Sequence, residues 1–130
     1  MNIKELIKMA KQAQQNAYAP YSNFKVGCAI LCQNGEIVTG CNIENIAGTS
    51  NCAERTAMFS AIAKGNRDFE MFAVIGDGKS YCYPCGTCRQ IIMEHSPNAI
   101  IVCAKNENDY QQYKITELLP HAFYPDNLKK

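Results

Sequence analysis

The sequence predicts a single α/β domain spanning residues 1–130, built on one mixed sheet with helices packed on its faces. Segments with the residue spacing of amphipathic helices alternate along the chain with short apolar runs typical of strands. No repeat, low-complexity stretch or linker interrupts the 130 residues, a length that suits one domain. Hydrophobic residues form 47% and charged residues 19% of the chain, a balance that excludes intrinsic disorder.

The first expected element is an amphipathic helix, and a hairpin follows it. Apolar side chains recur at helical spacing at Ile3, Leu6, Ile7, Ala10, Ala13 and Ala17. Pro20 ends any continuation of this helix. Strands are expected over residues 24–32 and 37–42. Asn34-Gly35 between them favours a type I′ turn, whose two central residues both need positive φ.

The middle of the chain predicts a loop, a helix and a strand. Residues 44–51 are polar and are expected to form a loop. Residues 52–64 have helical periodicity, and Gly65 directly after them suits a left-handed helix cap. Residues 71–75 form a short apolar run that indicates a buried strand.

The last third repeats this pattern. Residues 76–84 are rich in Gly, Ser and Tyr and are expected to form a loop. A second helix is expected over residues 85–95 and an apolar strand over residues 99–104. Residues 116–119 suggest a short capped turn before Pro120.

Charge and cysteine content narrow the functional class. The net charge is +1 and the pI about 7.5, so the chain is not expected to bind nucleic acid or an anionic membrane surface. The first fifteen residues carry three lysines and show no signal peptide or membrane span. Eight cysteines then predict a reducing, cytoplasmic location, where thiols stay free or bind metal. Cys28, Cys32 and Cys103 lie in apolar runs and are expected to be core residues.

Two short segments indicate a metal site. One is Cys52-Ala53-Glu54, and the other is Pro84-Cys85-Gly86-Thr87-Cys88. Each falls at an expected helix start, where the helix dipole favours the thiolate that zinc binds. Cys85 and Cys88 are three residues apart and project from one helical turn. The sequence therefore predicts one Zn²⁺ held by Cys52, Cys85 and Cys88.

Three protein ligands indicate a catalytic zinc, because they leave the fourth position open for water, whose pKa would then fall to about 7. Glu54 is two residues past Cys52, so it is expected beside the metal as the catalytic carboxylate that shuttles protons. Arg55 is expected to donate to the sulfur atoms and offset their negative charge. The alternative for Arg55 is a solvated helix residue.

Other arrangements of the cysteines are weaker. Cys82, Cys85 and Cys88 form C-x₂-C-x₂-C, but the further cysteine and proline of an iron–sulfur run are missing. Cys82, His95 or His121 would be a fourth ligand of a structural zinc. A redox pair of Cys85 and Cys88 is a third alternative. None of these non-catalytic zinc or redox modules explains Cys-Ala-Glu at a second helix start.

The chain closely resembles the small, homotetrameric, zinc-dependent cytidine deaminases. The matching blocks run through most of the sequence: 17–22 (AYAPYS), 26–27 (VG), 40–45 (GCNIEN), 52–57 (CAERTA), 84–86 (PCG), 88–90 (CRQ) and 117–120 (ELLP). The resemblance implies a three-layer α/β/α sandwich with a mixed five-stranded sheet. It also implies hydrolytic deamination of cytidine and 2′-deoxycytidine in pyrimidine salvage.

The resemblance assigns further residues to substrate binding. Phe24 matches the aromatic residue that packs on the pyrimidine nucleoside, and Asn42 and Glu44 match the pair that binds the ribose hydroxyls. Ala53 matches the position whose backbone contacts the base. Phe123 matches an aromatic residue that reaches into a neighbouring subunit's site, which implies a homotetramer with sites near subunit interfaces.

One segment departs from the family. Residues 46–51 (IAGTSN) are one residue shorter than the usual spacing and lack its common tyrosine. In having a short loop with a glycine at this place, the chain also resembles the blasticidin S deaminases, which act on a cytosine nucleoside antibiotic. Those enzymes usually lack the arginine after Cys-Ala-Glu and the Asn-Ile-Glu-Asn block, both present here. Blasticidin S deamination is therefore the alternative function.

Overall fold

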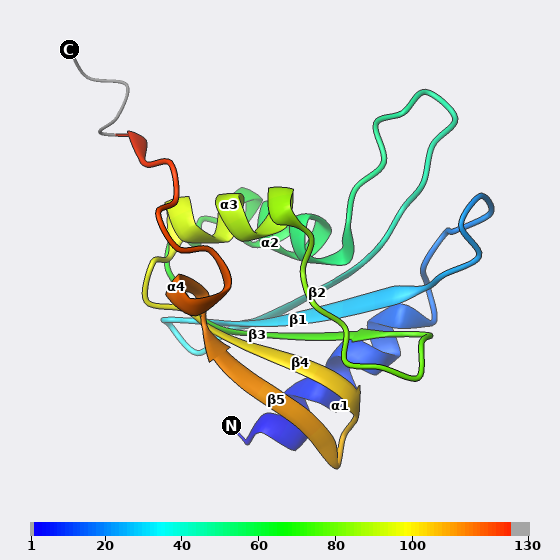
Figure 1. The fold of residues 1–130 in the computed structure, drawn as a ribbon, viewed down its shortest axis with the longest axis horizontal. Coiled ribbons are helices and arrows are strands. Elements are labelled where there is room, and N and C mark those ends of the chain that lie inside the picture. The colour runs from blue at the N-terminus through cyan, green and yellow to red at the C-terminus, as the bar shows by residue number, and fades with distance from the viewer. Residues whose placement is uncertain (1, 126–130) are drawn as a thin grey trace.

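A five-stranded mixed sheet forms the centre of the molecule (Figure 1). This computed structural model describes residues 2–125. Its elements are, in chain order, α1 (Ile3–Gln14), β1 (Val26–Cys32), β2 (Ile37–Cys41), α2 (Ala53–Ala63), β3 (Phe69–Gly76), α3 (Gly86–His95), β4 (Ile100–Asn106), β5 (Asp109–Lys114) and α4 (Ile115–Leu118). In this part of the chain, no helix is long and apolar enough to cross a bilayer.

The strands lie in the order β2-β1-β3-β4-β5. β3 and β4 are parallel and are connected through α3, whereas every other neighbouring pair is antiparallel. A parallel pair needs such a crossover, because a tight turn cannot join its strands.

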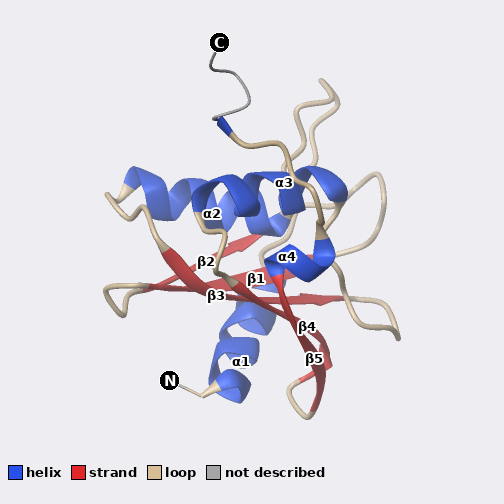
Figure 2. Ribbon diagram, turned by 60° about the vertical axis from the view of Figure 1, so that its left-hand side comes forward, coloured by secondary structure: helices blue, strands red, loops and turns tan. Residues whose placement is uncertain are grey.

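Helices cover both faces of the sheet, so the predicted three-layer α/β/α sandwich is confirmed (Figure 2). α1 lies on one face, and α2 and α3 lie on the other. Side chains alternate between two cores along the central strands. Phe72 and Val74 of β3 join the core beneath α2 and α3, whereas Ala73 and Ile75 join the core beneath α1. This burial on both faces explains why these strands are continuous apolar runs.

Two glycines let the helices approach the sheet closely. A Cβ on Gly27 of β1 would lie 1.9 Å from the carbonyl oxygen of Ala10 in α1. A Cβ on Gly40 of β2 would lie 2.4 Å from the backbone nitrogen of Ala57 in α2. Any side chain at either position would therefore force a helix away from the sheet.

The predicted helices are confirmed, with small differences at their ends. α1 ends at Gln14, before the predicted Ala17, and buried Gln14 extends its inner face. α2 ends at Ala63, and Gly65 follows its C-cap Lys64 with a φ of 100°, the left-handed conformation expected there. The amide of Gly65 donates to the carbonyl of Ile62, and that of Asn66 donates to the carbonyl of Ala61. This pair of bonds is a Schellman motif.

The β1–β2 hairpin is confirmed, but the type I′ turn is wrong. Gly35 has a φ of 90°, whereas Asn34 does not have a positive φ. The amide of Gly35 donates to the carbonyl of Cys32, which matches a three-residue loop ending in a left-handed glycine. The Asn34 side chain accepts from the amide of Glu36 and donates to Asn66, and these bonds hold it in this loop.

The fifth strand, implied only by the resemblance, is β5 at one edge of the sheet. Its sequence DYQQYK lacks the alternation of apolar and polar residues that indicates a strand. An edge strand needs little apolar surface, since it has one neighbour and much of it faces solvent.

The fold brings three distant segments to one end of the sheet. β2 and β3 are both antiparallel to β1, so they run in the same direction and end together. Val26 at the start of β1 pairs with Gly76 at the end of β3, and Gly27 pairs with Cys41 at the end of β2. The chain that leads to α2 and the chain that leads to α3 therefore start at the same end of the sheet.

Candidate active site

The two predicted cysteine segments lie at helix N-termini, as expected. Cys52 is the N-cap of α2 and Cys85 is the N-cap of α3, both with extended backbone. Cys88 is buried in the first turn of α3. Neither N-cap cysteine makes a side-chain capping hydrogen bond to the backbone of its own helix, so neither thiol is used as a helix cap.

These three thiols form a group that fits zinc. Their Sγ atoms all lie within 4.8 Å of one another, and those of Cys52 and Cys85 are 3.7 Å apart. In a tetrahedral zinc site with Zn–S bonds of about 2.3 Å, the sulfur atoms are about 3.8 Å apart. Among residues 2–125 no other His, Cys, Asp or Glu joins the group, which leaves one coordination position for water.

Cys82, His95 and His121 are therefore not in the ligand group, as the catalytic interpretation predicts. All eight cysteines are free thiols, including Cys85 and Cys88. Cys28, Cys32 and Cys103 are buried in the core beneath α2 and α3, which confirms their expected structural role.

The three thiols are chemically unequal. The pKa of Cys52 is lowered to about 5, chiefly by a hydrogen bond from the Cys88 thiol and also by Arg55 and Cys85. The pKa of Cys88 is raised because it donates to Cys52 and is buried. Cys52 is thus a thiolate at neutral pH, whereas metal binding must displace the proton of Cys88.

Arg55 points toward the sulfur atoms. Its Nη2 donates to the Sγ of Cys52 at 3.2 Å, which is the contact expected from the sequence. Its Nε is buried and has no partner within the described chain. A guanidinium at this place stabilises negative charge on the thiolates.

Glu54 is buried in the first turn of α2, with 3% of its surface exposed. The pKa of its carboxyl is raised to about 7, chiefly by burial and also by the negative charge of Cys52. Arg55 opposes this shift. A carboxyl with a pKa near 7 can both accept and release a proton at neutral pH.

A pocket of about 190 Å³ opens beside Glu54. It is lined by Phe24, Val26, Asn42, Cys52, Ala53, Glu54, Cys82, Tyr83 and Cys85. The ring of Phe24 packs against Gly76, where a Cβ would lie 2.9 Å from two ring atoms. This wall brings an aromatic ring, a carboxyl and two of the thiols into one cavity.

The two predicted ribose-binding residues occupy different places. Asn42 lines the pocket, where its amide accepts from the backbone of Val26 and donates to that of Phe24. Glu44 lies outside the pocket lining and accepts from the backbone amides of Tyr21 and Ser22. Asn42 therefore fixes the segment carrying Phe24, and Glu44 fixes the preceding loop.

Phe123 and the short loop 46–51 also lie outside this pocket. Phe123 is 55% exposed and makes backbone hydrogen bonds with the Gln90 side chain. The loop is exposed along its length up to Ser50, and Ile46 is 90% exposed. Neither contributes to the cavity of its own chain.

Sequence reasoning missed three lining residues, namely Val26, Cys82 and Tyr83. Cys82 and Tyr83 directly precede Pro84-Cys85. Their closeness in sequence to a ligand cysteine could have predicted that they line the pocket. Val26 gave no such signal, since its place depends on pairing with Gly76 across the sheet.

Comparisons with known proteins agree with this site. Residues 1–104 match the family described as the cytidine and deoxycytidylate deaminase zinc-binding region. Cytidine deaminases of Halalkalibacterium halodurans and Sporosarcina psychrophila are 45% and 43% identical over 130 residues, covering 98% of this chain and 98% and 96% of theirs. A blasticidin-S deaminase of Bacillus cereus is more distant, at 29% identity over 125 residues, covering 89% of this chain and 88% of its own.

A solved structure gives the same result. The crystal structure of cytidine deaminase from Burkholderia pseudomallei superposes with a TM-score of 0.90 at 44% identity, covering 95% of this chain and 100% of that one. The zinc-binding family match and the three clustered thiols agree on the cofactor, Zn²⁺. The chain therefore belongs to the cytidine and deoxycytidylate deaminase family.

Proposed function

We propose that this protein is an enzyme that hydrolytically deaminates cytidine and 2′-deoxycytidine to uridine and 2′-deoxyuridine, a reaction of pyrimidine salvage. The observation that carries the proposal is one pocket that joins zinc-binding thiols to a buried carboxyl. In that pocket Glu54 has a pKa of about 7 and lies beside Cys52 and Cys85. The match to cytidine deaminases over nearly the whole chain supports the same substrate class.

The chain's residues suit the proton transfers of this reaction. Cys52, Cys85 and Cys88 would hold the zinc, which would supply the Lewis acidity that activates water near neutral pH. Glu54 takes one proton from the attacking water and delivers it to N3 of the pyrimidine. It then passes the second proton to the departing amine, so that ammonia leaves and the water oxygen becomes the carbonyl oxygen at C4.

The remaining pocket residues would bind the nucleoside. Phe24 and Ala53 both line the pocket, where the Phe24 ring would stack on the pyrimidine and the Ala53 backbone would contact the base edge. Asn42 keeps unused hydrogen-bonding capacity for a ribose hydroxyl, because each amide atom makes one protein bond. Glu44 would reach a ribose hydroxyl from the pocket's outer side.

The proposed assembly is a homotetramer, in which Phe123 would reach the nucleoside site of a neighbouring subunit. Its exposure and its place outside the pocket of its own chain agree with this role. Light scattering should give four times the monomer mass, and a monomeric mass would contradict the proposal. Phe123→Ala should raise KM for cytidine and leave the proton transfers by Glu54 intact.

Incubation of the zinc-loaded protein with cytidine tests the activity. The reaction is followed by the absorbance change that accompanies conversion of cytidine to uridine. Cytidine and 2′-deoxycytidine should both be converted. A parallel incubation with blasticidin S separates the two nucleoside deaminase activities. Absence of turnover on cytidine by the zinc-loaded protein would contradict the proposal. Turnover of blasticidin S alone would show that the protein is a blasticidin S deaminase.

A further inference from the structure

The short segment before β1 carries the Phe24 ring but belongs to no strand. Residues 23–25 have no regular secondary structure, so no sheet ladder satisfies their backbone polar groups. Side chains from other parts of the fold act as partners instead. The amide of Phe24 donates to Oγ of Ser22, and its carbonyl accepts from the side chain of Asn42. The position of the ring therefore depends on the side chains that hold this segment.

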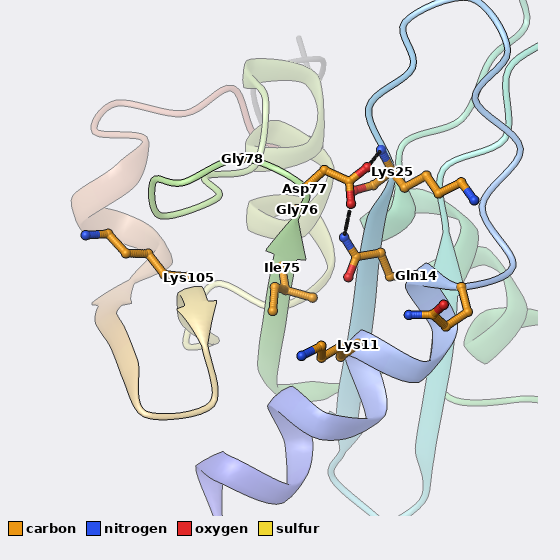
Figure 3. A pocket seen from close by; sticks show the side chains of 9 residues that line it. Lys11, Gln14, Lys25, Ile75, Gly76, Asp77, Gly78 and Lys105 are labelled. Carbon is orange, nitrogen blue, oxygen red and sulfur yellow. Dashed lines mark hydrogen bonds between the residues drawn. The ribbon is translucent and has the colours of Figure 1, made fainter.

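Lys25, the next residue, is held through both polar groups of its backbone. Its amide donates to Oδ2 of Asp77 at 2.9 Å, and its carbonyl accepts from Nε2 of Gln14 at 3.0 Å. Nε2 of Gln14 also donates to Oδ1 of Asp77 at 3.0 Å, which joins the two partners. Figure 3 shows the Asp77 carboxylate between the Lys25 backbone and the Gln14 side chain. The end of α1 and the residue after β3 thus hold Lys25 together.

A close contact between α1 and β1 brings Gln14 to this place. A Cβ on Gly27 would lie 2.8 Å from the backbone nitrogen of Gln14 and 2.9 Å from its Cβ, so the last turn of α1 lies directly on the strand. Gln14 is 7% exposed, and burial restricts the conformations of its side chain. The fold therefore presents its amide to the carbonyl of Lys25, two residues before Gly27.

Asp77 also connects the two surfaces that meet at the Phe24 ring. Its chain neighbours Gly76 and Gly78 both face the ring: a Cβ on Gly76 would lie 2.9 Å from the nearest ring atoms, and one on Gly78 would lie 3.4 Å away. The Asp77 side chain binds the residue that follows Phe24. One carboxylate therefore fixes the ring relative to the glycines on which it packs.

We infer that Asp77 and Gln14 are positioning residues for the nucleoside site and act on it through Phe24. This inference rests on the proposed function, in which the Phe24 ring stacks on the pyrimidine. Neither residue lines the pocket beside Glu54, and both line a separate pocket on the α1 face (Figure 3). Their effect on the nucleoside is therefore indirect. A ring that is already held in place loses less conformational freedom when a base stacks on it.

Steady-state kinetics of the zinc-loaded protein with cytidine test the inference. Asp77→Ala should raise KM by about tenfold, because both hydrogen bonds to the carboxylate are lost. The kcat should stay within about twofold, since Asp77 does not touch the reacting atoms. Asp77→Asn keeps one acceptor and should raise KM less than Asp77→Ala. Asp68→Ala is the matched control, since Asp68 is an exposed aspartate directly before β3, and KM should equal that of the wild type.

A double variant separates positioning of the ring from a general loss of structure. In a Phe24→Ala background there is no ring to position, so adding Asp77→Ala should change KM by less than about twofold. A rise in KM that is equal with and without the Phe24 ring would overturn the inference. So would an unchanged KM in Asp77→Ala alone.

Hydrogen exchange of the Lys25 backbone amide is a second measurement, and it needs no turnover. Exchange should be about tenfold faster in Asp77→Ala than in the wild type and unchanged in Asp68→Ala, because only Asp77 accepts from this amide. Equal exchange in all three proteins would overturn the inference. Faster exchange in Asp77→Ala, together with a wild type that does not deaminate cytidine, would support the hydrogen-bonded arrangement and contradict the proposed function.

Discussion

Arg55 Nη2 donates a hydrogen bond to Cys52 Sγ at 3.2 Å across the first turn of α2. The two residues are three apart in sequence, which places them on one face of the helix. The bond pairs a guanidinium with the Cys52 thiol, whose pKa is lowered to about 5. Arg55 thereby links the helix that carries Glu54 to the metal-binding group.

Arg55→Gln should weaken zinc retention by about tenfold, because partners of metal ligands typically contribute that much to metal affinity. The variant loses the charge that stabilises the Cys52 thiolate. Competition with a colorimetric zinc chelator measures the affinity. Arg55→Lys keeps the charge and should retain more zinc than Arg55→Gln. Equal zinc affinity in all three proteins would contradict the prediction.

Glu54→Gln should lower turnover of cytidine by about 10²-fold or more, since the amide cannot carry the proton. One zinc per chain should remain bound, because Glu54 is outside the ligand group. Turnover and metal content are measured on the same preparation. Loss of zinc together with activity would instead make Glu54 a structural residue.

The contribution of Glu54 to the stability of the zinc-free protein should fall as pH rises, because the pKa of Glu54 in the folded state is raised to about 7. The same carboxyl in the unfolded chain has a pKa of about 4.3. Its contribution to the stability of the folded state is therefore fully present below about pH 4.3 and is lost as the pH rises to about 7. Urea unfolding at about pH 4.5 and pH 8 should show Glu54→Gln gaining about 3 kcal/mol over the wild type at the higher pH. If the difference in the free energy of unfolding between Glu54→Gln and the wild type were the same at both pH values, Glu54 would not be a buried, protonated carboxyl.

Cys88→Ser should abolish tight zinc binding, whereas Cys82→Ser should leave one zinc per chain. Both cysteines lie near the pocket, but only Cys88 belongs to the group of clustered Sγ atoms. Metal analysis after dialysis against a weak chelator measures the difference. Zinc loss from Cys82→Ser would place Cys82 in the ligand set.

Gly40→Ala should destabilise the protein by about 3 kcal/mol, because its Cβ would collide with the backbone of α2. Gly86→Ala is the control, since its Cβ would meet no atom within 4 Å. Urea unfolding of both variants measures the free energy of unfolding. Similar values for the two would show that α2 moves away at little cost.

The spacing of apolar residues predicted the elements that are buried on one face or on both faces. The amphipathic spacing of α1 and the apolar runs of β3 and β4 reflect burial directly, so sequence periodicity revealed them. β5 has no such pattern, because an edge strand is held by pairing with β4. The turn at Asn34 was also decided by distant contacts, since Asn66 fixes its side chain.

The sequence by itself determined the two halves of the metal-binding group. Cys52 and Glu54 are two residues apart on one helix start, and Cys85 and Cys88 are three apart on another, so local spacing dictates how each set is presented. The tertiary structure decided what surrounds them. β2 and β3 both run antiparallel to β1, which alone brings Phe24, Asn42 and Cys82 to the same cavity. Strand pairing across the sheet joins residues far apart in the chain, and no local pattern encodes that register.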